Sequence, residues 1–267
     1  MGILYFFDDY VKKYIMRGKK YCNPTNTSYV EEGVSCIREN DVNLYFYTKN
    51  NITIAFDAGH LNYKNIKNEF QKIKINQLDI KCCFLTHADV DHAGGIDVKG
   101  ENIYPNAQVY LGKEEEQYLT KSKFRMKKFG IKLKNCVEIS NNYKLISDGE
   151  IININGIKVE AILIPGHTLG HTCYVVDEKI LITGDCLAIN EEGGYSFFDF
   201  FTQYPELNKK SLRKLKEKIS NKNILLVCTG HSGVRKDMEK LFAHIDKSAV
   251  ATRKQPFDLE GPFDITK

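Results

Sequence analysis

The sequence lacks a long apolar run, which argues against a membrane-spanning helix and against a cleavable leader. Its N-terminal apolar stretch, residues 3–7, ends at Asp8 and Asp9 and is too short for the core of a signal peptide. No later stretch approaches the roughly 20 apolar residues that cross a bilayer as a helix. These absences predict a cytoplasmic protein with no membrane partner.

Paired cysteine motifs and a charge excess are absent as well. The eight cysteines are scattered without the C-x-x-C spacing of a zinc knuckle or redox pair, so we expect reduced, mostly buried thiols. The net charge of +4 is the difference between 38 basic and 34 acidic residues, which predicts neither a nucleic-acid surface nor an acidic tail. A small-molecule substrate is therefore expected. The sequence gives no sign of the oligomeric state.

The most basic segment is 121–134, which contains seven lysine and arginine residues. Such a run could attract an anionic substrate, but it is more typical of a solvated helix face. A solvated helix face is therefore the expected structure, and attraction of an anionic substrate stays open.

Composition and length favour one large domain. With 267 residues, of which 42% are hydrophobic, the chain can bury a sizeable core. It contains no repeats, low-complexity tracts or linkers rich in proline, glycine and serine. We expect a single domain over 1–249 and an irregular C-terminal extension over 250–267.

Apolar spacing predicts an α/β protein in which helices alternate with β-branched strands. Apolar residues three or four positions apart predict helices over 66–73, 205–219 and 234–245. Pro205 suits the first turn of its helix, where its missing N–H group would have no partner in any case.

Five apolar runs end abruptly at a residue that can bind a metal ion or orient a ligand. Because ligands of open α/β sheets gather at the carboxyl ends of strands, these end residues are expected to converge. The runs are 52–56 before Asp57, 82–86 before His87, 162–166 before His167, 180–184 before Asp185, and 225–230 before His231.

The densest polar segment is 86–95, Thr-His-Ala-Asp-Val-Asp-His-Ala-Gly-Gly. It places four side chains that can bind metal, His87, Asp89, Asp91 and His92, within six residues. Packing rarely needs such density, because buried histidine and aspartate are costly without partners. A solvated acidic turn with two ordinary histidines is the alternative for this segment taken alone.

With this motif the chain resembles the metallo-β-lactamase superfamily, whose pattern is T-H-x-H-x-D-H-x-G-G. Further matches follow in the order of the family, and the resemblance extends over roughly 43–249. They are Phe56-Asp57-Ala58-Gly59 for D-x-G, residues 165–171 for P-G-H-T-x-G-H, Thr183-Gly184-Asp185 for T-G-D, and Gly230-His231 for the closing G-H.

The resemblance implies a four-layer αββα sandwich, with two mixed β-sheets face to face and helices outside. It also implies two metal ions held by His87, Asp89 and His167, by Asp91, His92 and His231, and by Asp185 as the bridge. Asp57 and His171 fall outside this set. Asp57 would orient a ligand histidine by accepting its other ring N–H, and His171 is expected either to support a ligand or to pack beside the site. Asp91 would also act in catalysis.

The chain departs from the family at Asp89, where histidine is usual. An aspartate oxygen reaches about as far as the Nδ1 atom of histidine, so the resemblance still implies a metal site. The extra carboxylate favours harder metals. Zinc remains the expected ion, and iron or manganese is the alternative.

The activity that the resemblance implies is hydrolysis by a hydroxide held between two metal ions, acting on a small ester, thioester, lactone or amide. Two other activities stay open. One is redox chemistry at a di-iron centre, as in the flavin-dependent di-iron branch, which has glutamate at the position of Asp89. The other is phosphodiester hydrolysis, as in the nucleases of the superfamily.

The aromatic stretch after Asp185 is a candidate substrate pocket. Tyr195, Phe197 and Phe198 follow the bridging residue closely, which would place them near the mouth of the site. The alternative is that these rings pack in the core between a strand and the helix over 205–219.

Overall fold

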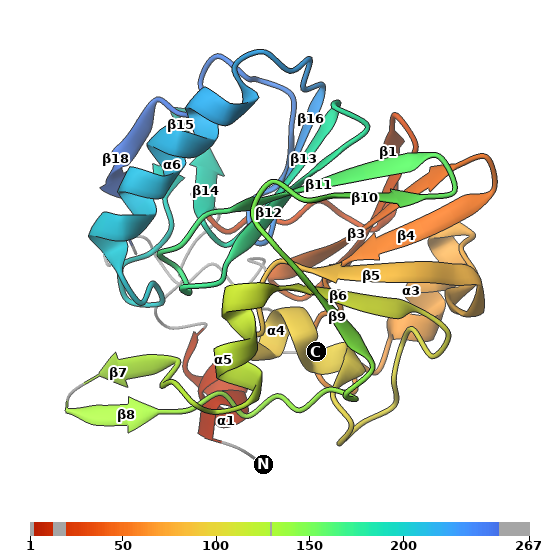
Figure 1. Cartoon of the computed structure of the whole chain (residues 1–267), viewed down its shortest axis with the longest axis horizontal. Coiled ribbons are helices and arrows are strands. Elements are labelled where there is room, and N and C mark those ends of the chain that lie inside the picture. Colours follow the sequence, from red (N-terminus) through yellow and green to blue (C-terminus); the bar gives the residue numbers. More distant parts are fainter. Residues whose placement is uncertain (1–2, 13–19, 129, 251–267) are drawn as a thin grey trace.

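The computed structural model in Figure 1 shows two sheets packed face to face, with helices on their outer faces. The structure describes residues 3–12, 20–128 and 130–250. The expected C-terminal extension, 250–267, therefore lies outside the described residues except for Val250.

The first sheet has seven strands, and its second half is parallel, from β4 through β5 and β6 to β9. In spatial order its strands are β1 (Ser28–Glu31), β2 (Val34–Glu39), β3 (Val42–Lys49), β4 (Ile52–Phe56), β5 (Ile80–Leu85), β6 (Gln108–Gly112) and β9 (Tyr143–Ile146).

The second sheet has six strands and is also mixed, because β13 and β16 run parallel while its other pairs are antiparallel. In spatial order its strands are β10 (Ile151–Ile154), β11 (Ile157–Leu163), β12 (Thr172–Val176), β13 (Ile180–Gly184), β16 (Leu226–Thr229) and β17 (Gly233–Arg235).

Smaller elements complete the described chain. A three-stranded sheet contains β14 (Leu187–Asn190), β15 (Gly193–Ser196) and β18 (His244–Ser248), and a hairpin contains β7 (Met126–Lys128) and β8 (Ile131–Leu133). The helices are α1 (Ile3–Tyr10), α3 (Ile66–Ile73), α4 (Val90–Ala93), α5 (Glu116–Leu119) and α6 (Pro205–Ile219), with 3₁₀ turns η1 (Gln77–Asp79), η2 (Gly94–Ile96) and η3 (Lys113–Glu115).

Three apolar layers hold these elements together. Between the two sheets, Phe56 and Phe84 of the first sheet pack with Tyr174 of the second. Outside the first sheet, Phe70 of α3 packs against Phe46. Outside the second sheet, side chains of α6, including Leu212, join the apolar cluster. This arrangement confirms the αββα sandwich.

Two of the three predicted helices are confirmed. The structure has α3 over Ile66–Ile73 and α6 over Pro205–Ile219, with Pro205 in the first turn. The helix predicted over 234–245 is wrong. Val234 pairs with Cys228 in the second sheet and packs between the sheets, whereas Leu241 and Ile245 pack beside α6. The helix-like spacing is misleading here, because Val234 belongs to the layer between the sheets and the other two residues belong to the layer beside α6.

Two further expectations concern cysteine and membranes. All eight cysteines are free, and seven of them are buried, as expected. Among residues 3–12, 20–128 and 130–250, every helix is too short or too polar to cross a bilayer.

Candidate metal centre

The side chains that follow the five predicted strand ends come together, as expected. Asp57 follows β4, His87 follows β5, Asp185 follows β13, and His167 and His231 lie shortly after β11 and β16. The ligand atoms form two groups in which every pair lies within 4.8 Å. One group is Asp91, His92, Asp185 and His231, and the other is His87, His167 and Asp185.

We call Asp91, His92 and His231 the Asp91 half of the centre. The Nε2 atom of His231 lies 3.3 Å from Oδ2 of Asp91 and 3.0 Å from Oδ2 of Asp185. The Nε2 atom of His92 lies 3.3 Å from the other oxygen of Asp185. Asp185 thus faces both imidazoles of this half.

We call His87, Asp89 and His167 the Asp89 half. The Oδ2 atom of Asp89 lies 3.5 Å from Nε2 of His87 and 3.3 Å from Nε2 of His167. Asp185 reaches this half too, with Oδ2 3.9 Å from Nε2 of His167. The structure therefore brings six of the seven predicted ligands into the two groups, with Asp185 in both. Asp89 is in neither group and lies beside His87 and His167.

Polar groups outside the centre orient three of the imidazoles. Nδ1 of His92 lies 2.8 Å from the Asp57 carboxylate, and Nδ1 of His231 lies 2.6 Å from the backbone oxygen of Asp41. Nδ1 of His87 lies 2.9 Å from the Thr86 hydroxyl, which donates to Asp57. Each contact directs an Nε2 atom to the centre, which is the arrangement that metal-binding histidines need.

Asp57 is held in an unusual backbone conformation for this task. Its φ of 59° lies in the left-handed region, which non-glycine residues rarely adopt. Its carboxylate accepts hydrogen bonds from the backbone N–H and hydroxyl of Thr86. Backbone strain of this kind is common at functional sites.

Unpartnered buried atoms show that the residues fit a metal ion. Nε2 of His87, Nε2 of His92 and Oδ1 of Asp185 are buried and have no hydrogen-bond partner among the described residues. Buried polar atoms without partners are costly, and native proteins contain few of them. A divalent cation bound by these atoms would remove that cost, and imidazole with carboxylate is a donor set that zinc accepts.

His171 supports the bridging residue. Its Nε2 atom accepts the backbone N–H of Asp185 at 3.1 Å. It is not in the two groups of ligand atoms described above, and its contact fixes the backbone that carries the Asp185 side chain.

The carboxylates of the centre are held in their charged forms. Burial alone would raise the pKa of Asp185, but the imidazoles of His231 and His92 hold that pKa well below its usual range. Burial lowers the pKa of His167 to about 4, with Asp89 opposing and Arg125 adding to this effect. At neutral pH the centre thus offers charged carboxylates and a neutral His167 imidazole.

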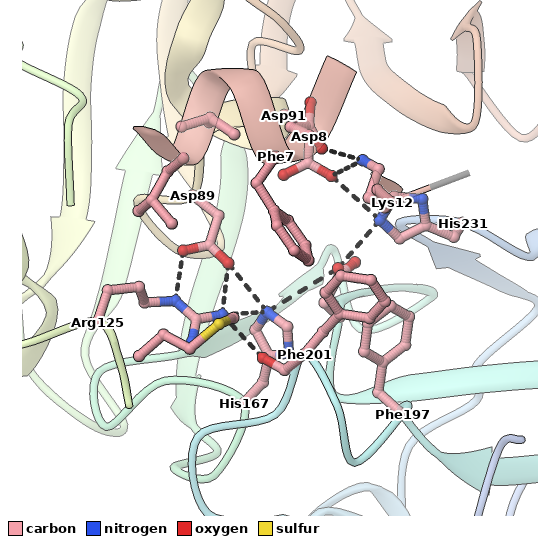
Figure 2. Close-up of a pocket in the computed structure, with 14 residues that line it drawn as sticks. Phe7, Asp8, Lys12, Asp89, Asp91, Arg125, His167, Phe197, Phe201 and His231 are labelled. Atoms are coloured by element: carbon pink, nitrogen blue, oxygen red, sulfur yellow. Dashed lines mark hydrogen bonds and ion pairs between the residues drawn. The ribbon is translucent and has the colours of Figure 1, made fainter. Parts of the chain in front are cut away.

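Arg125 is a residue of the centre that the sequence analysis missed. Segment 121–134 is not a solvated helix face, because it contains the β7–β8 hairpin and an Arg125 that is 2% exposed. The Arg125 guanidinium donates to both oxygens of Asp89 and lies 3.0 Å from Nε2 of His167 (Figure 2). The sequence offered one signal, a carboxylate at position 89 that calls for a compensating cation.

Lys12 is the second missed residue. It is 4% exposed, and its Nζ atom lies 2.6 Å from Asp8 and 2.7 Å from Asp91 (Figure 2). The same atom lies 2.9 Å from Asp41. Burial opposes the charge of Lys12, but the carboxylates of Asp41, Asp8 and Asp91 hold its pKa well above the usual value. His60 joins this network through Asp8 at 2.9 Å.

A small pocket opens onto both halves. Its free space is about 50 Å³, which holds a few water-sized groups. Phe197 lines this pocket, as expected. Tyr195 and Phe198 do not line it but pack against Tyr21, in the same cluster that contains Phe197, so the pocket prediction is wrong for these two residues. The apolar walls are Leu4, Phe7, Val90, Met126, Phe197 and Phe201.

Curated relatives match part of the chain. A probable polyketide biosynthesis zinc-dependent hydrolase, PksB of Bacillus subtilis (strain 168), is 27% identical over 161 residues, which are 58% of this chain and 58% of that protein. The hydroxyacylglutathione hydrolase GloC of Haemophilus influenzae is 29% identical over 132 residues, which are 49% of this chain and 59% of that protein. The chain thus spans less than two thirds of the length of these relatives.

Solved structures share the fold at low sequence identity. A subclass B3 metallo-β-lactamase described as having an active-site glutamic acid aligns with a TM-score of 0.60 and 15% identity, over 84% of this chain and 88% of its own. The superfamily protein ST1585 of Sulfolobus tokodaii aligns with a TM-score of 0.52 and 18% identity, over 78% and 82% of the two chains.

The family itself is shown by a match to most of the chain. The model that describes the metallo-beta-lactamase superfamily matches residues 37–231. This range contains all seven predicted ligands, together with Asp57, His171 and Arg125. The chain therefore belongs to the metallo-β-lactamase superfamily.

Proposed function

We propose that the chain is a metal-dependent hydrolase that cleaves a small ester, thioester, lactone or amide. One observation carries the proposal. Buried Nε2 atoms of His87 and His92 and a buried oxygen of Asp185 lack partners among the described residues, at a centre that opens into a pocket with apolar walls. The relatives PksB, named as a probable zinc-dependent hydrolase, and GloC, named as a hydroxyacylglutathione hydrolase, support the same class of reaction.

The metal would be held by the six residues of the two halves together with Asp185. Zinc is the ion we propose, with iron or manganese as the alternatives. A bound divalent ion lowers the pKa of a coordinated water and polarises a carbonyl oxygen. Among the described residues, no serine or cysteine lines the pocket that opens onto this centre, so the attacking group would be water.

Asp91 would position the attacking water. In hydrolysis the water oxygen bonds to the carbonyl carbon, the bond from that carbon to the leaving group breaks, and a water proton ends on the leaving atom. Asp91 lines the pocket, and although burial opposes its charge, Lys12 and His92 hold its pKa well below the usual value. Its carboxylate can therefore accept a hydrogen bond from the water and orient it.

The apolar walls would hold the organic part of the substrate. Phe197, Phe201, Phe7 and Met126 line the same pocket as Asp91. Rings and a thioether at this position favour an apolar acyl group and keep bulk water away from the reacting atoms. A substrate larger than a few water-sized groups needs more than the 50 Å³ of this pocket, so we expect the N-terminal helix that carries Phe7 to shift on binding.

Loading and removing metal tests the function. Protein stripped with a chelator should lose turnover of chromogenic esters and thioesters, and zinc should restore it. Asp148→Asn removes an exposed carboxylate that pairs with Lys218 and should behave as the unaltered chain. Bound iron with oxygen consumption and no hydrolysis would contradict the proposal and favour redox chemistry.

A further inference from the structure

Arg125 occupies the ligand atoms of two residues of the Asp89 half, Asp89 and His167. Its Nε and one terminal nitrogen donate to the two oxygens of Asp89, each at 2.5 Å. The same terminal nitrogen lies 3.0 Å from Nε2 of His167. A neutral imidazole has a single lone pair on its acceptor nitrogen, so Nε2 of His167 cannot accept this N–H and bind a metal ion together.

His87 is then the one residue of this half whose ligand atom stays free among the described residues. Its Nε2 atom is buried and has no hydrogen-bond partner there. With Asp185 it offers two ligands, whereas structural and catalytic zinc sites use three or four protein ligands. The Asp89 half is therefore short of ligands while Arg125 keeps its place.

The Asp91 half contains a cation as well, but the cation leaves the ligands available. Lys12 lies 2.7 Å from Oδ2 of Asp91, and its other ion pairs within the described residues are with Asp8 and Asp41. A carboxylate oxygen has more than one acceptor site, so Asp91 can accept from Lys12 and still bind an ion. Nε2 of His92 has no partner among the described residues.

We propose that the chain binds one metal ion tightly, between Asp91, His92, Asp185 and His231, and that Arg125 supplies the positive charge of the Asp89 half in place of a second ion. The inference rests on the proposed function, because it concerns the same centre. It changes the expected pair of ions to one ion and one guanidinium.

The guanidinium can perform part of the task of a second ion. It stays protonated in proteins and presents five N–H donors in a fixed plane. Arg125 lines the pocket, and its Nη1 group is buried with no partner among the described residues. It can therefore donate to the carbonyl oxygen of a substrate and stabilise the negative charge that grows there during attack. This contact would make Arg125 a catalytic residue.

Metal stoichiometry tests the inference without relying on activity. The metal-stripped full chain is titrated with Co²⁺, whose visible spectrum reports binding, and retained zinc is measured after dialysis. The unaltered chain should bind one equivalent in one step. The double variant Asp89→His with Arg125→Gln should bind a second equivalent about 10–100-fold more tightly than the unaltered chain, the range that partners of metal ligands control.

Two features keep the result interpretable. The double variant removes both charges of the ion pair, so no charge is left buried alone. Lys127→Gln removes a positive charge from an exposed position on the same hairpin, and this variant should still bind one equivalent. If the double variant does not fold, the stoichiometry of the unaltered chain decides.

The outcomes separate the two proposals. Two equivalents of equal affinity in the unaltered chain would overturn the assignment of Arg125 and leave the hydrolase proposal standing. A chain that binds no divalent ion at all would overturn both. One equivalent that stays one in a folded double variant would show that Arg125 does not exclude the second ion.

Discussion

The two halves of the centre have similar ligands but are neutralised by cations of different origin. Asp89 pairs with Arg125, which lies inside the range that matches the superfamily, whereas Asp91 pairs with Lys12, which lies outside it. The centre is therefore not confined to the matched range, 37–231. An N-terminal residue close in space to the ligands completes the charge balance of one half.

The two imidazoles of the Asp91 half differ in what orients them. His92 contacts the side chain of Asp57, while His231 contacts the backbone oxygen of Asp41. A side-chain partner can be altered by substitution, but a backbone partner cannot. Mutation can therefore weaken one imidazole of this half selectively.

Asp185→Asn should have the largest effect, because Asp185 faces both halves. We expect kcat/KM to fall by more than about 100-fold, since even the outer partners of metal ligands are worth 10–100-fold. Hydrolysis of a chromogenic ester and zinc content after dialysis measure the change. Asp148→Asn is the matched control on the surface. Equal zinc content and equal rates in the two variants would argue against a bridging position.

Asp57→Asn should weaken the Asp91 half by less. The amide keeps an oxygen that can accept from Nδ1 of His92, but it loses the negative charge that makes the imidazole a better ligand. We expect metal affinity to fall by about 10–100-fold. A competition titration with a coloured chelator measures this affinity.

A control for Asp57→Asn is Asp177→Asn, which removes a carboxylate that pairs with Lys49 near a turn of the second sheet. It should leave the metal affinity unchanged. A loss of affinity confined to Asp177→Asn would mean that Asp57 serves the backbone fold and not His92.

The sequence predicted the parts of the centre that lie at strand ends. Apolar runs identify strands, and the residue after each run is fixed in position by its sheet, so Asp57, His87 and Asp185 could be placed without coordinates. The helices α3 and α6 were predictable for a similar reason, because one apolar face packs against one layer.

The two cations could not be predicted in this way. Arg125 lies 36 positions from Asp89, and Lys12 lies 79 positions from Asp91, so no local spacing joins either pair. Both residues come from segments rich in basic side chains, where one buried member resembles its solvated neighbours. The failed helix over 234–245 has a related cause, because its apolar residues pack in two layers.

Glu115→Gln should remove a pH dependence of the unfolding free energy that arises beside the Asp89 half. Glu115 accepts from the backbone N–H of Ala88 and from the hydroxyl of Thr168, so it joins the loops that carry Asp89 and His167. Burial raises its pKa to about 7, with His87 opposing. Between pH 4.5 and 7 the folded chain therefore holds a proton that the unfolded chain has lost.

The stabilisation by this proton is complete below pH 4.5 and is lost as the pH rises through 7. Glutamine stays neutral at every pH. Between pH 5 and 8 the free energy of unfolding should therefore fall by roughly 2–3 kcal/mol less in the variant than in the unaltered chain. Urea unfolding of both metal-stripped chains at the two pH values measures the difference. Parallel pH profiles would mean that the Glu115 carboxyl is ionised throughout.

Phe197→Leu and Tyr195→Phe should have the smallest effects, and their order locates the substrate. Phe197 lines the pocket and contacts rings of both halves, His231 at 5.6 Å and His167 at 5.3 Å. Its loss should lower kcat/KM about threefold to tenfold, since aromatic pairs are worth roughly 0.5–1.5 kcal/mol. Tyr195 packs on Tyr21 and His244, and its hydroxyl donates to Glu192.

Removing the Tyr195 hydroxyl should change kcat/KM less than about twofold, because a single hydrogen bond near the surface contributes little. The two residues lie two positions apart in the chain, so their difference tests the packing seen in the structure and not the proximity of the segment to Asp185. If Tyr195→Phe lowers the rate more than Phe197→Leu does, the substrate binds against Tyr195 and Tyr21, and the pocket beside Arg125 and Lys12 is not where the acyl group lies.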